Sequence, residues 1–192
     1  MERLYLETPT LERKQDAIDY IRENYDYHSQ IHGAGSLDNY LDDYEGWLLK
    51  LEKDRNQIPN EERVPAETYF LVRESDNRIV GIINIRLTLN QRLRESGGHI
   101  GYGIRPTERR KGYNKINLYL ALEVCQEHGI EEVMLTCDKN NLGSAKTMQA
   151  LGGRLTREFV EDGLLEQEYW INVEESLEKN RELYAEQTAK RR

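Results

Sequence analysis

Residues 104–114 read IRPTERRKGYN, a stretch in which a predicted strand turns through a basic loop into a predicted buried helix. We expect the strand over residues 99–104 and the helix over residues 112–127, where apolar side chains occur on several sides of the helix. Backbone N–H groups at the start of a helix lack partners within it and lie at the positive end of its dipole. The loop therefore predicts an anion site, and Gly112 lets a ligand approach the backbone closely.

The loop is basic although the protein is acidic. The formal net charge is −8, yet residues 105–115 hold several basic side chains against one acid, Glu108. An acidic protein disfavours nucleic acid as the main partner, because phosphate binding requires a basic face. The local charge indicates a site for a small polyanion, although a solvated run of charges in a surface turn explains residues 109–111 equally well. The glycine–lysine pattern of a P-loop is absent, and residues 101–103 lack the third glycine of a dinucleotide-binding fingerprint.

The segments on either side of the loop predict a single α/β (α+β) domain over residues 1–192. Its mixed, mostly antiparallel sheet is flanked by helices, and the element order is β-α-α-β-β-β-α-β-α-β-β. An apolar stripe from Leu37 to Leu51 predicts the second helix, and Asn141 is expected to cap a short helix that ends at Leu151. The tail, residues 174–192, is charged and helix-prone, and its end is expected to fray. The strands are expected at residues 3–6, 69–72, 79–85, 99–104, 133–137, 155–160 and 164–172, and the helices at residues 11–25, 37–51, 112–127 and 141–151.

Composition indicates a folded protein of the cytoplasm. Of the 192 residues, 38% are hydrophobic and 32% are charged, which fits a modest core under a charged surface. No apolar run reaches the ~18 residues that a membrane helix needs, and the N-terminus has no signal-peptide pattern. Cys125 and Cys137 are too few for a disulfide framework. His28 and His32 lie four residues apart without a third ligand, so we expect surface histidines and no metal site.

Three motifs together resemble the GNAT superfamily of acyl-CoA-dependent N-acyltransferases. The family's hallmark is Gln or Arg, two residues, Gly, one residue, then Gly or Ala; the sequence matches it at Arg109 and Gly112 but departs at Asn114. Residues 98–106 are similar to the family's fourth strand, which splays from the fifth to admit the pantetheine arm. Residues 136–153 resemble the next strand and its asparagine-led helix. The resemblance covers residues 69–172 as a CoA-binding core.

This resemblance implies an enzyme that moves the acetyl group of acetyl-CoA onto a primary amine, with a small molecule favoured over a protein as the acceptor. It implies that His99, where relatives often have a glutamate on the fourth strand, is the catalytic base; the alternative is a strand-edge histidine whose ring is satisfied by a backbone carbonyl. Met148 replaces the usual tyrosine acid, which leaves the acid unassigned. Many relatives pair, which implies a homodimer. The residues expected to hold acetyl-CoA are Ile104 through its backbone, then Arg109, Arg110, Lys111, Gly112, Tyr113, Asn114 and Lys115 around the pyrophosphate, and Asn141 and Ser144 near the pantetheine arm.

The acceptor and the turnover stay open at this level. Acidic side chains in residues 38–45 would suit a cationic amine, or they form the solvent-exposed face of a helix whose aromatic side chains pack in the core. A non-catalytic CoA-binding module is the main alternative to an enzyme; Met148 and Asn114 favour it, and it would bind acetyl-CoA without releasing CoA. A protein-interaction domain that docks through the charged C-terminal helix would bind no CoA at all.

Overall fold

The computed structural model describes residues 2–192, whose strands form two sheets. The first sheet has the strand order β1-β2-β3-β4 and the second has the order β5-β7-β6. Neighbouring strands within each sheet run antiparallel. The strands are β1 (Leu4–Glu7), β2 (Ala66–Arg73), β3 (Arg78–Arg86), β4 (Ile100–Ile104), β5 (Glu132–Asp138), β6 (Arg154–Glu161) and β7 (Leu164–Asn172).

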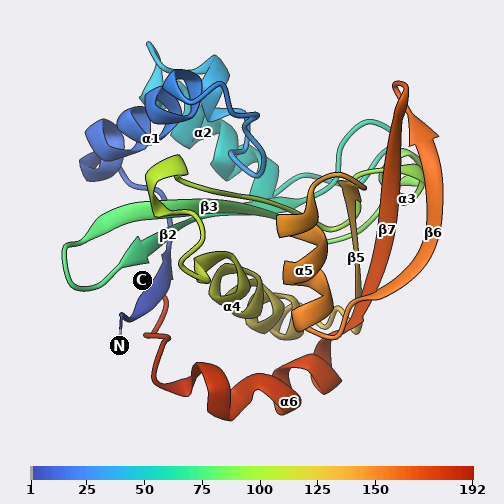
Figure 1. Ribbon diagram of the computed structural model, residues 1–192. Coiled ribbons are helices and arrows are strands. Elements are labelled where there is room, and N and C mark those ends of the chain that lie inside the picture. Colours follow the sequence, from blue (N-terminus) through green and yellow to red (C-terminus); the bar gives the residue numbers. More distant parts are fainter. Residues whose placement is uncertain (1) are drawn as a thin grey trace.

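Helices cover both faces of the first sheet (Figure 1). On one face, α1 and α2 bury an aromatic group in which Trp47 packs against Tyr44 and against Phe70 of β2. On the opposite face, α4 packs against β3 and β4 while α6 packs against α4, so α4 is enclosed and its apolar side chains can point in several directions. The helices are α1 (Lys14–Asp26), α2 (Tyr44–Arg55), α3 (Gln91–Glu95), α4 (Tyr113–Glu127), α5 (Leu142–Ala150) and α6 (Val173–Ala185).

The two sheets are joined at one end of β4 and separate toward the other. Gly98 bridges to Leu135 of β5, and the His99 N–H donates to the carbonyl of Met134 over 2.7 Å. Beyond this junction β4 and β5 belong to different sheets, so their facing backbone edges do not form a shared ladder. Backbone groups on such an edge need partners from elsewhere. The split therefore creates a place where an extended ligand can pair with the strands.

The predicted fold class is confirmed, with antiparallel sheets packed between helices, but two elements differ from expectation. The second helix begins at Tyr44, because Asp43 caps it by accepting the Gly46 N–H over 3.0 Å. Leu37 is buried, yet it belongs to a separate 3-10 turn, Leu37–Asn39. The sequence reading also missed α3, whose five residues are too few to show a helical period.

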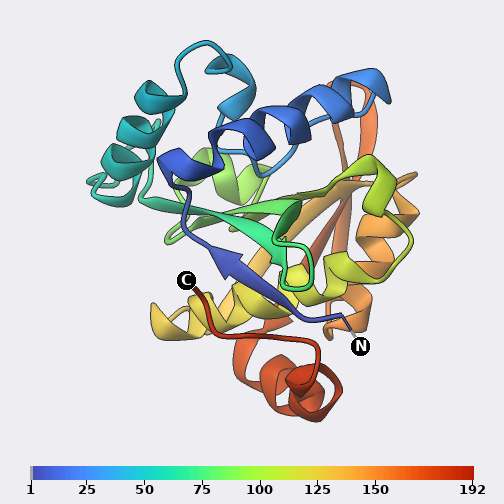
Figure 2. The same ribbon diagram turned by 90° about the vertical axis from the view of Figure 1, so that its left-hand side faces the viewer.

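The C-terminal residues are held along β1, so the predicted fraying is wrong. Leu4 donates its N–H to the carbonyl of Gln187 and accepts the N–H of Ala189 on its own carbonyl, each over 2.9 Å. The Arg192 N–H donates to the carbonyl of Leu6 over 3.0 Å. Figure 2 shows the end of the chain returning to the first strand after α6. The tail thereby covers the outer edge of β1, which would otherwise be an open edge strand.

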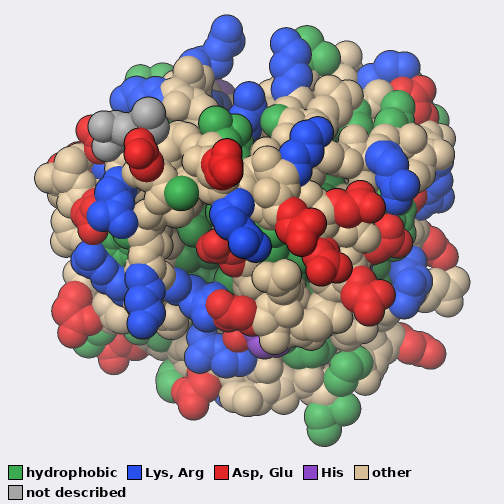
Figure 3. Space-filling view, turned by 90° about the horizontal axis from the view of Figure 1, so that it is seen from below, with side chains coloured by type: hydrophobic (Ala, Val, Ile, Leu, Met, Phe, Trp, Pro, Cys, Tyr) green, Lys and Arg blue, Asp and Glu red, His purple; other side chains and the backbone are tan. Residues whose placement is uncertain are grey.

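The surface carries both signs of charge. On the face seen from below, acidic and basic side chains are interspersed, and hydrophobic side chains appear only in small separate groups (Figure 3). Within residues 2–192, no helix combines the length and the apolar character needed to cross a membrane.

Candidate functional site

A cleft of about 680 Å³ opens beside the C-terminal end of β4, where β4 no longer pairs with β5. It is enclosed by the end of β4, the loop before α4, the first turns of α4 and α5, and the segment that follows α1. The structure thus brings together most of the residues predicted to hold a ligand, whereas Lys111 points elsewhere. The predicted residues that line the cleft are Ile104, Arg109, Arg110, Gly112, Tyr113, Asn114, Lys115, Asn141 and Ser144.

The loop before α4 presents backbone donors to this cleft. Gly112 has a φ of 83° and Arg110 a φ of 65°, both in the left-handed region, and Gly112 sits at the N-cap of α4. A Cβ at Gly112 would meet nothing within 4 Å, so the space in front of it is open. Within the described chain, the N–H groups of residues 110–114 have no hydrogen-bond acceptor. They form a concave set of donors at the positive end of a helix, which suits a phosphate or pyrophosphate.

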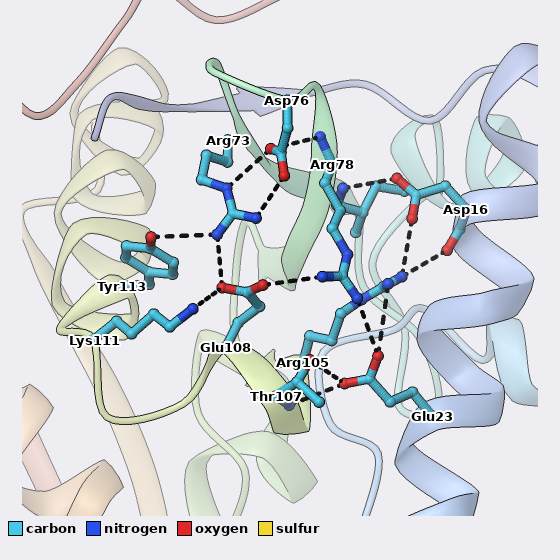
Figure 4. A network of polar contacts seen from close by, with 11 residues as sticks. Asp16, Glu23, Arg73, Asp76, Arg78, Arg105, Thr107, Glu108, Lys111 and Tyr113 are labelled. Carbon is cyan, nitrogen blue, oxygen red and sulfur yellow. Dashed lines mark hydrogen bonds and ion pairs between the residues drawn. The ribbon is translucent and has the colours of Figure 1, made fainter. Parts of the chain in front are cut away.

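Most of the basic side chains of this loop are engaged within the protein. Glu108 is buried, and its carboxylate accepts from Arg73 over 2.7 Å, Lys111 over 2.8 Å and Arg78 over 3.1 Å (Figure 4). Burial alone would raise the pKa of Glu108, but Lys111 and Arg73 lower it by more, so the net shift is downward. Lys111 therefore stabilises the loop through Glu108 and does not itself line the cleft.

Two arginines of the loop are engaged in the same way. Arg105 is buried and pairs with Asp16 of α1 over 2.9 Å (Figure 4). Arg109 donates to the carbonyl of Ile104 over 3.1 Å and to the hydroxyl of Ser29 over 3.0 Å. Among the loop's basic side chains, Arg110 and Lys115 are the exposed ones without a side-chain hydrogen bond or ion pair to residues 2–192. These two remain available to a bound anion.

Polar side chains cross the cleft between β4 and α5. The hydroxyl of Tyr102 lies 2.8 Å from that of Ser144, and Asn141 caps α5 by accepting the Ser144 N–H over 3.1 Å. Burial raises the pKa of Tyr102, so its hydroxyl keeps its proton at neutral pH. The Oδ1 atom of Asn114 is buried and has no partner within residues 2–192, so the departure from the family pattern at this position leaves an acceptor beside the cleft.

His99 lies at the junction of the two sheets, outside the residues that line the cleft. It is buried, and its Nδ1 accepts the N–H of Met134 over 3.0 Å. Burial, and then the positive charges of Arg94 and Arg86, lower its pKa to about 4. The imidazole is therefore neutral at pH 7, and one of its two nitrogens is occupied by the backbone.

A second cavity, of about 560 Å³, is lined by the segment between α1 and α2, by α2 and α3, and by the ends of β2 and β3. The segment between α1 and α2 borders both this cavity and the cleft, and His32 lines both. This segment passes directly over β4, since a Cβ at Gly33 would lie 2.3 Å from the carbonyl oxygen of Gly101. Partial burial lowers the pKa of His32, and its Nε2 lies 3.2 Å from Oε1 of Gln30. Sequence reading missed this placement, although glycines in both crossing segments are a usable signal of close backbone approach.

Comparison with known proteins gives a family match and a shared fold. A sequence profile of the Acetyltransferase (GNAT) family matches residues 21–153. RimJ of Mycobacterium smegmatis, in complex with CoA-disulfide, has a TM-score of 0.69 and 14% identity, covering 97% of this chain and 93% of that one. The ribosomal-protein-S5-alanine acetyltransferase of Vibrio fischeri has a TM-score of 0.67 and 14% identity, over 90% of this chain and 94% of that one. The microcin C7 self-immunity acetyltransferase MccE, in complex with acetyl-CoA and AMP, has a TM-score of 0.63 and 13% identity, over 88% and 92%. No curated protein sequence matches the chain.

Proposed function

The chain belongs to the acetyltransferase (GNAT) family, and we propose that it transfers the acetyl group of acetyl-CoA directly to the primary amine of a small molecule. It is an acetyl-CoA-dependent acetyltransferase, with acetyl-CoA as its co-substrate. The observation that supports this most strongly is one coincidence of position. The amides of residues 110–114, which have no acceptor within the described chain, open on the same cleft as the end of β4, the strand whose edge is separated from β5.

The residues of the cleft fit the parts of acetyl-CoA. The amides around Gly112 would hold the pyrophosphate, and Arg110 and Lys115 would add positive charge at its rim. The free edge of β4, ending at Ile104, would pair with the amides of the pantetheine arm. The five residues of β4 span roughly 16 Å at ~3.3 Å per residue, a length that an extended pantetheine arm can follow. The thioester would then lie toward the closed end of the split.

An amine must lose a proton before it attacks a thioester, because an alkyl amine with a pKa near ~10.4 is mostly protonated at neutral pH. His32 suits this role better than His99. A proton on Nε2 satisfies the contact of His32 with Gln30 and leaves Nδ1 free to accept, at a position that borders both cavities. His99 has its Nδ1 bonded to Met134 and lies at the sheet junction, where it suits a role in holding the two sheets together.

Tyr102 is a candidate proton donor for the departing thiolate. Met148 is buried in the core at the position of the usual tyrosine, but the hydroxyl of Tyr102 reaches the cleft beside Ser144. The hydroxyl is protonated when the thiolate leaves, but burial raises its pKa and so makes it a weaker acid than an ordinary tyrosine. A thiol with a pKa near ~8.5 is already a tolerable leaving group, so this donor would accelerate the step without being indispensable.

Calorimetry with acetyl-CoA, followed by detection of released CoA thiol with a panel of primary amines, tests the proposal. Binding with turnover of a small amine is the expected result. Binding without CoA release from small amines or peptides would favour the alternative, a non-catalytic CoA-binding module, while the absence of binding by the folded protein would refute the proposed function. The homodimer stays a prediction, which analytical ultracentrifugation would test.

A further inference from the structure

Arg86, the last residue of β3, brings a cation without an acid partner to the second cavity. Its Nη1 donates to the carbonyls of Gly97 over 3.2 Å and Gly98 over 2.9 Å. Within residues 2–192, no carboxylate lies within 4.0 Å of its guanidinium, whereas the similarly enclosed Arg73 and Arg105 both have one. Burying a cation without a counter-ion is costly, so an unpaired arginine in a cavity indicates that an anion from outside completes the site.

Arg92 of α3 lines the same cavity and also has no carboxylate partner within the described residues. Burial, and then the nearby charge of Arg92, lower the pKa of Arg86. Two cations held close together repel each other, and an anion between them would remove that repulsion. The guanidinium group matches a carboxylate in particular, because its planar fork can donate two parallel hydrogen bonds.

These arginines lie at the end of β4 where the acetyl group would arrive. The Arg86 N–H donates to the carbonyl of His99 over 2.7 Å, and Gly98, which accepts from the Arg86 side chain, bridges to β5. This is the closed end of the split, opposite the phosphate loop at Gly112. An acceptor anchored at Arg86 would therefore hold its amine close to the thioester.

The same cavity is also lined by acids from the segments around α2. Asp54 pairs with Lys50 over 2.6 Å, while Asp38 and Glu62 have no such partner within residues 2–192. A cavity lined by charges of both signs suits a molecule that carries both an amine and an anion. We propose that the acceptor is a small amine bearing a carboxylate, such as an amino acid, and that Arg86 and Arg92 bind this carboxylate. The proposal rests on the proposed acetyl transfer, because it names the acceptor of that reaction.

Matched pairs of amines test the proposal, each pair being an L-amino acid and its decarboxylated amine, such as tyrosine with tyramine or lysine with cadaverine. Acetyl-CoA binding is first confirmed by calorimetry for each variant, and CoA release then gives kcat and KM. We expect the carboxylate-bearing member to be the better acceptor. Arg86→Gln and Arg92→Gln should raise its KM about tenfold each and leave the KM of the decarboxylated member unchanged.

Arg94→Gln is the matched control, since Arg94 lies exposed on the same helix as Arg92 but does not line the cavity. A merely structural role of Arg86, through its bonds to Gly97 and Gly98, would change both members of a pair alike. Exposed Arg92 makes no such bonds, so its substitution tests the site even if the Arg86 variant is unstable. Decarboxylated amines that match or exceed their amino acids, or no turnover of any carboxylate-bearing amine by protein that binds acetyl-CoA, would overturn the inference. Failure to bind acetyl-CoA would instead refute the proposed function.

Discussion

The phosphate loop and the second cavity both contain several basic side chains, but they use them in opposite ways. In the loop, Arg105 and Lys111 are paired with carboxylates, and the donors left for a ligand are mainly backbone amides. In the cavity, Arg86 and Arg92 have no carboxylate partner within the described residues. The most basic stretch of the sequence is therefore built chiefly to hold a backbone shape, while Arg86 and Arg92 lie in a segment with fewer basic residues.

The density of charge in a sequence therefore does not locate free charge in the folded protein. Glu108 lies under the loop and draws in Arg73 and Arg78 from β2 and β3 (Figure 4). A buried carboxylate requires such partners, and the loop conformation then depends on them. We therefore expect substitutions in the two regions to impair binding in different ways. The loop should be sensitive to changes of backbone conformation, and the cavity should be sensitive to changes of side-chain charge.

Gly112→Trp should have the largest effect, because it fills the open space in front of the loop amides and disfavours their left-handed backbone. We expect acetyl-CoA binding to weaken about 1,000-fold, ~4 kcal/mol, through the loss of two or more charge-assisted hydrogen bonds at about 1.5–3 kcal/mol each. Calorimetry measures the loss. Gly129→Trp is the matched control, since Gly129 also has a positive φ and open space but lies at the far end of α4. Binding retained by the Gly112 variant would mean that the backbone of this loop is not the phosphate site.

Glu108→Gln should destabilise the protein by about 3 kcal/mol, because it leaves Arg73 and Lys111 without their shared buried carboxylate. Thermal unfolding measures this, with Glu132→Gln as a control on an exposed ion pair. The pKa of Glu108 is lowered in the folded protein, so its contribution is complete above the ordinary glutamate pKa of ~4.3 and is lost as the pH falls through the lower folded value. The difference in stability between the wild type and Glu108→Gln should therefore become smaller at acidic pH. A difference that becomes larger at acidic pH would contradict the ion-pair account.

The sequence predicted the parts of this comparison that depend on neighbouring residues. The strand, loop and helix around Gly112 follow from local pattern, and so does the cap at Asn141. It could not predict which basic side chains are paired, because Asp16 meets Arg105 only after α1 packs against the sheet. The unpaired state of Arg86 is likewise a property of the folded cavity. The C-terminal segment along β1 was missed for the same reason, since its backbone bonds join residues at opposite ends of the chain.

His32→Gln tests the residue that borders both cavities, and we expect kcat to fall about 100-fold. Below the pKa of His32, which burial places under its ordinary ~6.5, a base at this position is protonated and inactive. The wild-type kcat should fall as the pH drops through that value, and the kcat of the variant should not show this acidic decrease. His28→Asn is the control, since His28 precedes His32 by four residues and lines neither cavity. If His99→Gln removes the acidic decrease of kcat and His32→Gln does not, His99 is the base, as the family resemblance implies.

The smallest expected effect on acetyl-CoA binding comes from Arg110, an unpaired cation of the loop, which we compare with the paired cation Lys111. Arg110→Gln removes an exposed charge that no residue of the described chain neutralises, so acetyl-CoA binding should weaken about threefold, ~0.7 kcal/mol, and depend less on salt. Lys111→Gln removes a charge already bound to Glu108 at 2.8 Å, so it should change thermal stability while leaving the salt dependence of binding near that of the wild type. Calorimetry at two ionic strengths and thermal unfolding distinguish the two variants. A larger loss of binding in the Lys111 variant would show that Lys111 leaves Glu108 for the ligand, and the contrast between the loop and the cavity would then be weaker than the contacts indicate.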